Sequence, residues 1–343
     1  MNEKKRTEIA ELGEFGLIDH LTKEFTVKNK STLRGVGDDA AVVAAGRDDA
    51  VVVTTDSLLE GIDFDLTYFP LKHLGYKAVT VGVSDVLAMN ALPEQIMISL
   101  GVSSKLPVEA LKDLYEGIEF ACNELGVDLV GGDTTASMTG LVINITTIGR
   151  AKRKAISYRS GAQFNDLICI TGNLGAAYMG LHLLEREKRV LKDVQNPEPQ
   201  FSGYEYLLQR YLKPRARKDI IEALAAEKIV PTSMIDISDG LASEVLQICK
   251  ASKCGARIYL DRIPIAKQTS ALAEEMHADP VVAALNGGND YELMFTVPLA
   301  MQEQVMALGL VDVVGHITRE STGAYLVTPD GSDIKLRAQG FKE

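Results

Sequence analysis

The stretch YKAVTVGVSDVLAMNALP (76–93) decides how the first half of this 343-residue chain folds. It belongs to a helix expected over residues 71–92, because its apolar residues recur at spacings of three and four. The residues on this one face are Leu74, Ala78, Val81, Asp85, Ala88 and Leu92. Asp85 is therefore predicted to point inward with the apolar side chains. A buried carboxylate requires a partner, and in an acidic chain a metal ion is the leading candidate.

Other aspartates stand where apolar runs give way to glycine-rich or small residues. They are Asp38 and Asp39 in GVGDDAA, Asp56 in VVVTTDS, Asp133 in VGGDTT, and Asp236 and Asp239 in DISDG. Each motif alone is also typical of an ordinary turn or helix cap. Gathered at one place, however, these carboxylates would raise one another's pKa unless cations stood between them. If the segments converge, the sequence predicts a site for Mg²⁺ or Mn²⁺ that works on phosphates.

The composition is that of an ordinary globular protein, with 46% apolar and 24% charged residues and a length that favours two domains. A net charge of −11 argues against a nucleic-acid or anionic-membrane surface. The four cysteines form no CxxC pair, and neither a membrane span nor a signal peptide is evident. We expect buried thiols, a cytoplasmic location and no zinc site among the five scattered histidines.

The elements around the first helix suggest where the N-terminal domain ends. Strands are expected at 50–55, 96–102 and 141–148, and a second helix at 107–125, which opens with Pro107 and stops at Gly126. The basic stretch 149–165 then interrupts the apolar pattern. We therefore expect an N-terminal domain over 1–150 and a C-terminal domain over 151–343.

The second half alternates strand and helix patterns, which indicates an α/β or α+β domain. Strands are expected at 167–171, 257–261 and 292–297, with a final one at 311–317, and helices at 176–187, 204–228 with a break at Pro214, 241–253 and 299–308. A weak repeat links the two halves. SDVLA (84–88) matches SDGLA (238–242), and GGD (131–133) is echoed by GGND (287–290), so an ancestral duplication is plausible.

Several familiar phosphate and catalytic motifs are absent. The chain has no GxxxxGK[ST], no protein-kinase HRD or DFG signature and no GxSxG elbow. The glycines of Gly172–Gly175 follow a strand and precede a helix, which is a weak phosphate-loop signal and equally typical of a tight turn. Arg150, at the end of an apolar strand, is placed to reach a nucleotide phosphate, although basic residues in such a linker are most often only solvated.

Eight motifs together carry a specific resemblance. In chain order they are GEFGLI (13–18), GVGDDAAVV (35–43), TTDSLLEGIDF (54–64), YKAVTVGVSDVLAMNALP (76–93), GGDTT (131–135), GRA (149–151), DISDGL (236–241) and GGNDYEL (287–293). In this order they resemble the thiamine-monophosphate kinase family of the aminoimidazole-ribonucleotide-synthetase-like superfamily. The resemblance spans nearly the whole chain. It implies an N-terminal α/β domain whose sheet forms a barrel with its counterpart in a homodimer, and a C-terminal α+β domain that closes the cleft.

The same resemblance implies ATP-dependent phosphorylation of thiamine monophosphate to thiamine diphosphate, with several Mg²⁺ ions assisting a direct in-line transfer. The residues that resemble the family's metal ligands are Asp39, Thr54, Thr55, Asp56, Asp85, Asp133, Asp236 and Asp239. The residues that resemble its ATP contacts are Tyr115, Gly132, Asp133, Arg150 and Ser238. Among these, Asp85, Asp133 and Arg150 are expected to be catalytic. Phe341 resembles the aromatic residue that packs on the thiamine ring.

Two positions on the substrate side depart from the family pattern. The family commonly has His where this chain has Asp63, and Glu where it has Asn289. Asp63 can still pair with a cationic thiazolium or accept a hydrogen bond from the aminopyrimidine, whereas Asn289 replaces only part of a carboxylate's role. Two alternatives stay open. One is an aminoimidazole-ribonucleotide-synthetase-type ligase, and the other is a non-catalytic nucleotide- or metal-binding regulator with the same fold.

Overall fold

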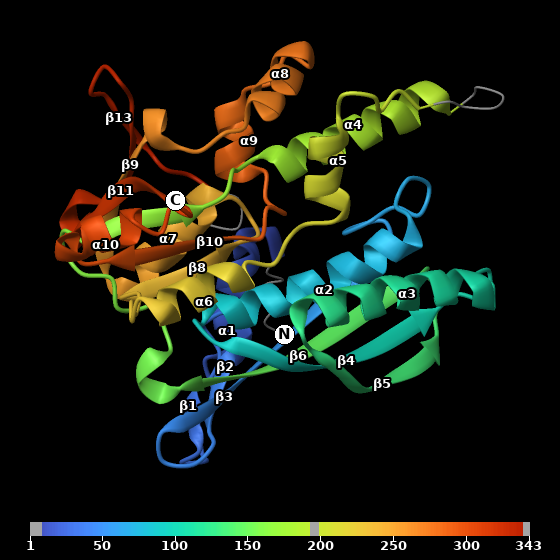
Figure 1. Ribbon diagram of the computed structural model, residues 1–343, viewed down its shortest axis with the longest axis horizontal. Coiled ribbons are helices and arrows are strands. Elements are labelled where there is room, and N and C mark those ends of the chain that lie inside the picture. The colour runs from blue at the N-terminus through green and yellow to red at the C-terminus, as the bar shows by residue number, and fades with distance from the viewer. Residues whose placement is uncertain (1–8, 193–198, 339–343) are drawn as a thin grey trace, which may run out of the picture.

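The computed structural model describes residues 9–192 and 199–338 and shows two domains, each built around one β-sheet (Figure 1). The N-terminal sheet has six described strands in the order β1-β2-β3-β6-β4-β5, and among them only the β4–β5 pair is parallel. Its strands are β1 (Thr32–Arg34), β2 (Ala41–Ala44), β3 (Asp49–Leu59), β4 (Leu92–Val102), β5 (Asp128–Ala136) and β6 (Val142–Lys152).

Two long helices cover one face of this sheet, α2 (Leu71–Ala88) against the strands and α3 (Val108–Leu125) against α2 (Figure 1). They approach closely because glycines stand at the crossing. A Cβ at Gly75 would lie 2.0 Å from the carbonyl oxygen of Leu114, and one at Gly117 would lie 1.9 Å from that of Lys72. Any larger residue at either glycine would push the two helices apart.

Helix α2 ends four residues earlier than the sequence predicts. Its last residue is Ala88, Asn90 adopts a left-handed φ of 54°, and Leu92 begins strand β4 with an exposed side chain. The helical spacing of Leu92 was therefore misleading. Asn90 makes the turn possible, because its short side chain tolerates this conformation and its Nδ2 donates to the carbonyl oxygen of Ala155 at 2.8 Å.

The C-terminal sheet has seven described strands in the order β13-β12-β9-β11-β7-β10-β8, and among them only the β12–β9 pair is parallel. Its strands are β7 (Leu167–Thr171), β8 (Ser233–Ile237), β9 (Cys254–Tyr259), β10 (Glu292–Val297), β11 (Val311–Arg319), β12 (Ala324–Val327) and β13 (Asp333–Lys335). Every residue of strands β7, β8 and β10 is buried, which explains why their sequences do not alternate between apolar and polar residues.

The remaining helices lie mainly in the C-terminal domain. They are α1 (Gly13–Thr22), α4 (Ala176–Leu191), α5 (Glu205–Leu212), α6 (Lys218–Ala226), α7 (Leu241–Ser252), α8 (Lys267–Glu275), α9 (Pro280–Asn286) and α10 (Gln302–Met306). Short 3₁₀ turns occur at Ile9–Glu11, Arg153–Ala155, Leu260–Arg262, Leu299–Met301 and Glu320–Thr322. In the described part of the chain, no helix has both the length and the apolar character needed to cross a bilayer.

Helix α2 also touches the C-terminal domain, at β8 and α5, and so lies between the two sheets (Figure 1). One apolar cluster runs through this junction, joining Leu74 and Val83 of α2 to Met234, Leu293 and Phe295 of the C-terminal sheet. The opposite face of that sheet packs against α7. The shared core holds the domains together. The polar residues of α2 lie at the junction between the two domains.

The sequence located most elements but missed several. The strands at 167–171 and 292–297 are confirmed, whereas the strand expected to be the last, at 311–317, is followed by β12 and β13. The missed elements were α1, α8, β1, β2 and the edge strand β5. Strand β5 (DLVGGDTTA) lacks apolar alternation, because every one of its residues is exposed.

Candidate active site

A cavity of about 340 Å³ opens where α2 meets the C-terminal domain. Most of its lining residues are polar or charged, and five of them are aspartates. The lining residues are Glu14, Asp56, Ser57, Leu58, Asp63, Lys77, Val81, Asp85, Asp236, Ser238, Asp239, Asn289 and Tyr291. Segments from both domains therefore converge here, as the positions of the aspartates in the sequence suggested.

Helix α2 contributes a stripe to this cavity. Lys77, Val81 and Asp85 all line it, and their spacing of four residues places them on one side of the helix. Asp85 is further fixed by Thr54 of β3, whose Oγ1 donates to Asp85 Oδ2 at 2.5 Å. Thr54 and Asp85 thus lie in direct contact, as a shared ligand set requires.

Three carboxylates form the tightest group at the cavity. One oxygen each from Asp39, Asp85 and Asp236 lies within 4.8 Å of the other two. Asp39 precedes β2, Asp85 is on α2 and Asp236 is on β8, so three distant segments meet. Such a spacing is suited to a divalent cation between the oxygens.

The loop that carries Asp39 is held by two arginines. The Nη2 of Arg159 lies 2.7 Å from Asp39 Oδ1, and its backbone N–H donates to Asp38 Oδ1 at 2.9 Å. Arg34 pairs with the other oxygen of Asp38 at 2.9 Å. Asp38 therefore shapes the loop, and Asp39 faces the cluster. Arg159 was not predicted from the sequence, because it lies in a basic stretch that is typical of a linker.

The electrostatics of the cluster favour a bound cation. Burial, followed by the charge of Asp39, raises the pKa of Asp56 to about 6 and that of Asp236 to about 7. Burial and the neighbouring carboxylates Asp56 and Asp236 also raise the pKa of Asp85. The Oδ2 atoms of Asp39 and Asp56 are buried and have no hydrogen-bond partner among the described residues. Oxygens of this kind fit a hard divalent ion, which would relieve the repulsion and complete their coordination.

Ser238 and Asp239 extend the site along the turn before α7. Both line the cavity, and the backbone N–H of Asp239 donates to Glu244 Oε1 at 2.9 Å. Burial raises the pKa values of both Asp239 and Glu244. Glu244, on α7, was not anticipated from the sequence.

The far end of the cavity carries a different set of groups. Lys77 Nζ donates to Asn289 Oδ1 at 2.9 Å and lies 4.1 Å from the ring centre of Tyr211. Asp63 accepts from the backbone N–H of Leu59 at 2.7 Å. The two positions that depart from the family pattern, Asp63 and Asn289, thus lie at one end of the cavity with Lys77. Lys77 was not predicted from the sequence, although its spacing of eight residues from Asp85 places both on one side of the helix.

Other expected site residues lie on the opposite face of the N-terminal sheet. Asp133 is in register with Ser99, which is in register with Asn144, and paired residues of neighbouring strands point to the same face. Asn144 Oδ1 accepts from Thr55 Oγ1 at 3.4 Å, so Thr55 shares this face. Arg150, also exposed, pairs with Glu94 at 2.8 Å. Within one chain, therefore, Thr55, Asp133 and Arg150 do not join the aspartate cluster.

Gly132, Tyr115 and Phe341 complete the expected set. Gly132 is on exposed strand β5, where a Cβ would lie 1.9 Å from the carbonyl oxygen of Ile98. Tyr115 lines a separate groove of about 540 Å³ between α3 and the start of β5. Phe341 lies outside the described residues.

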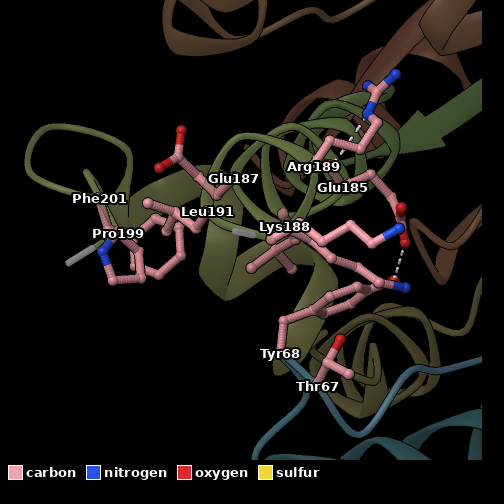
Figure 2. Close-up of a pocket in the computed structure, with 11 residues that line it drawn as sticks. Thr67, Tyr68, Glu185, Glu187, Lys188, Arg189, Leu191, Pro199 and Phe201 are labelled. Carbon is pink, nitrogen blue, oxygen red and sulfur yellow. Dashed lines mark hydrogen bonds between the residues drawn. The ribbon is translucent and has the colours of Figure 1, made fainter. Parts of the chain in front are cut away.

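A larger hollow, of about 570 Å³, lies elsewhere and carries no such cluster among its described residues. Figure 2 shows Glu185, Lys188 and Arg189 of α4 on one side of it and Thr67 and Tyr68 on the other. Its polar groups pair with one another or with nearby residues. Lys188 pairs with Asp65, and Tyr68 donates to Glu185 Oε1 at 2.7 Å. Size alone therefore does not identify the reactive site.

The turn at Gly172–Gly175 is not open to a phosphate. The backbone N–H groups of Gly175 and Ala177, at the start of α4, donate to the carboxylate of Asp290 at 2.7 and 3.3 Å. Arg210 lies 3.4 Å from the same carboxylate, and Asp290 is fully buried. The chain's own carboxylate thus occupies the position that an anion would take at this helix terminus.

Comparison with known proteins agrees with this architecture. Residues 37–151 match the AIR synthase related protein, N-terminal domain, and residues 165–327 match the AIR synthase related protein, C-terminal domain. The two-sheet fold and the site between its domains thus define an AIR synthase related protein.

Similar proteins of known activity identify the family within this class. The thiamine-monophosphate kinase of Bacillus subtilis (strain 168) is 30% identical over 96% of this chain and 99% of its own length. That of Buchnera aphidicola subsp. Schizaphis graminum is 35% identical over 96% and 98%. A solved structure, AaThiL complexed with AMPPCP and TMP, superposes with a TM-score of 0.80 at 30% identity, covering 96% of this chain and 97% of that one. The chain belongs to the thiamine-monophosphate kinase family.

Proposed function

We propose that this protein transfers the γ-phosphoryl group of ATP directly to thiamine monophosphate, giving thiamine diphosphate. The observation that carries the proposal is the group of buried Asp39 and Asp236 and half-buried Asp85 between the domains, in a chain similar over nearly its full length to thiamine-monophosphate kinases. The similar solved structure, with AMPPCP and TMP bound, supports the same pair of substrates.

Several Mg²⁺ ions would bind to the carboxylates around the cavity. The proposed ligands are Asp39, Thr54, Asp56, Asp85, Asp236 and Asp239. When bound, such ions screen the charge of two phosphate groups and stabilise the charge of the transition state. The protein holds these carboxylates in place by hydrogen bonds. Thr54 donates to Asp85, Ser84 to Asp236 and Arg159 to Asp39.

The acceptor needs little help from a base. A phosphate monoester, with a second pKa of about 6, is largely ionised at neutral pH, so its oxygen can attack phosphorus without prior deprotonation. In keeping with this, none of the described residues that line the cavity is a histidine. These residues instead supply alignment and charge compensation. Ser238, beside the cluster, is a proposed contact of ATP, and Asp63 and Asn289 are proposed contacts of the thiamine moiety.

A homodimer accounts for the residues that lie on the other face of the N-terminal sheet. Helices α2 and α3 cover one face, whereas strand β5 is exposed along its whole length, with Leu129 and Val130 among its exposed apolar residues. Pairing two such faces would bring Asp133 of one copy toward the site of the other. In this arrangement Asp133 and Thr55 are metal ligands supplied across the interface, and Gly132 and Arg150 lie at the ATP-binding side. Tyr115, on α3, is a further proposed contact of ATP.

The proposed enzyme is cytoplasmic, which the four free thiols support.

The test of the proposed function is incubation of the purified protein with ATP, Mg²⁺ and thiamine monophosphate, followed by chromatography for thiamine diphosphate. Turnover of formylglycinamidine ribonucleotide without thiamine diphosphate would instead favour the ligase, and binding of ATP with no transfer to any thiamine ester would favour a regulator.

A further inference from the structure

Lys77 stands out because it is a buried lysine without a counter-ion. Its side chain is only 1% exposed, and among the described residues no carboxylate forms an ion pair with it. Its hydrogen bond is to the neutral amide oxygen of Asn289, and aromatic rings of Tyr211 and Phe69 lie 4.1 and 5.6 Å from its Nζ. Burying an ammonium in this way is costly, and an apolar residue of the same length would fold more stably.

The position of Lys77 suggests what offsets that cost. It is the one cationic side chain among the described residues that line the aspartate cavity, and it lies on the same stripe of α2 as Asp85, two helical turns away. A ligand that reaches from the carboxylate cluster to the Lys77 end meets negative groups at one end and a positive group at the other. Of the two proposed substrates, the acceptor belongs at this end, because Asp63 and Asn289 adjoin Lys77.

We infer that Lys77 binds the phosphate of the acceptor and thereby selects a phosphorylated thiamine over thiamine itself. This inference rests on the proposed function. The ammonium donates to a phosphate oxygen, while Asn289 and the ring of Tyr211 hold the Nζ in place. Arg210, the neighbour of Tyr211 on α5, pairs with Asp290 and Glu292 and so ties α5 to the segment that carries Asn289.

The pKa of Lys77 is consistent with a role in binding a phosphate. Burial lowers the pKa of Lys77 to about 7, against a smaller opposite influence of Asp63. A bound phosphate dianion favours the charged ammonium, so acceptor binding itself would secure the proton on Lys77. Binding of the acceptor phosphate and protonation of Lys77 therefore favour each other.

The test compares two ligands that differ only in the phosphate. Dissociation constants of thiamine monophosphate and thiamine are measured by calorimetry with Mg²⁺ and without ATP, for the wild type and for Lys77→Met. Loss of a charge-assisted hydrogen bond predicts that the preference for the phosphorylated ligand shrinks about 10- to 100-fold. The affinity for thiamine and the KM for ATP should change by less than about threefold.

Two further variants control for structure. Lys213→Met removes a lysine that lies 4.4 Å from the ring centre of Phe120, outside the cavity, and should leave the preference unchanged. Lys77→Gln keeps a polar group and should behave like Lys77→Met, which covers the case in which the methionine side chain disturbs folding; thermal midpoints of all variants are recorded. An equal loss for both ligands, or no loss for either, would overturn the inference. Failure of the wild type to form thiamine diphosphate would instead count against the proposed function.

Discussion

Ser84 Oγ donates a hydrogen bond of 2.6 Å to Asp236 Oδ2, and this contact joins helix α2 of the N-terminal domain to strand β8 of the C-terminal domain. Both partners are buried. Asp85, the next residue of α2, lies in the same carboxylate group as Asp236. The junction between the domains and the proposed metal site therefore share residues. A substitution at Ser84 should affect both the contact between the domains and the binding of metal.

We expect Ser84→Ala to weaken Mg²⁺ binding by a few-fold near neutral pH. The hydroxyl favours the ionised form of Asp236, so its loss raises a pKa that is already about 7. The effect should fade at higher pH, where Asp236 ionises in either protein. Titration with Mg²⁺ at two pH values measures this. Ser243→Ala is the control, because its buried hydroxyl has no hydrogen-bond partner among the described residues; equal losses for both variants would contradict the prediction.

Asp85→Asn should lower turnover by at least about 100-fold while the protein stays folded, because an amide is a poorer ligand for Mg²⁺ and carries no charge. In the absence of Mg²⁺ the thermal midpoint should stay the same or rise, since the substitution removes one of several mutually repelling buried carboxylates. Single-turnover kinetics at saturating Mg²⁺ and calorimetric melting check the two parts. Turnover unchanged at saturating Mg²⁺ would exclude Asp85 from the mechanism.

Asp133→Asn should also reduce turnover strongly, and its effect should be exerted in the other subunit. If Asp85 and Asp133 of one site come from different chains, mixed dimers of Asp85→Asn and Asp133→Asn contain one intact site each. A dimer that contains one copy of each variant should then show about half of wild-type activity. Co-expression with two different tags, followed by assay of the doubly purified dimer, measures this. A mixture as inactive as its parents would place both aspartates in one chain's site.

The core of the site could be predicted because its residues obey local rules. Asp85 was found by helical spacing, since a carboxylate on an apolar face contradicts the usual pattern. The same rule applied to Lys77 would have found the other end of the cavity. A lysine there was overlooked because a long side chain on a helix can reach solvent from many positions.

The other residues and strands that were not predicted depend on contacts between distant segments. The spacing of residues along the sequence does not reveal such contacts. Arg159 holds Asp39 from 120 residues away, and β5 owes its strand conformation to pairing with β4. Thr55 and Thr54 are adjacent in sequence but point to opposite faces of β3, so only Thr54 reaches Asp85. The register of the whole sheet decides the face to which each of these side chains points.

The stability of the Mg²⁺-free protein should fall as the pH rises. Burial raises the folded-state pKa of Asp56 to about 6 and that of Asp236 to about 7, both from 3.8. The folded state thus binds protons more tightly than the unfolded chain, and this stabilisation is complete below about pH 4 and lost as the pH passes through 6 to 7. Mg²⁺ should restore the thermal midpoint near pH 8 and have little effect near pH 5. Asp236→Asn should show a flatter profile, and an equal Mg²⁺ effect at both pH values would count against the prediction.

Asp290→Asn should destabilise the fold, in contrast to Asp85→Asn. Asp290 accepts from the N–H groups of Gly175 and Ala177 at the start of α4 and lies beside Arg210. An amide would present an N–H group to one of these donors and leave the arginine with only part of its charge compensation. Breaking a buried pair of this kind costs about 3–5 kcal/mol, and denaturant unfolding measures the loss. Because Asp290 adjoins Asn289, the acceptor affinity should fall as well. A variant as stable as the wild type would show that Asp290 is not required to hold this segment in place.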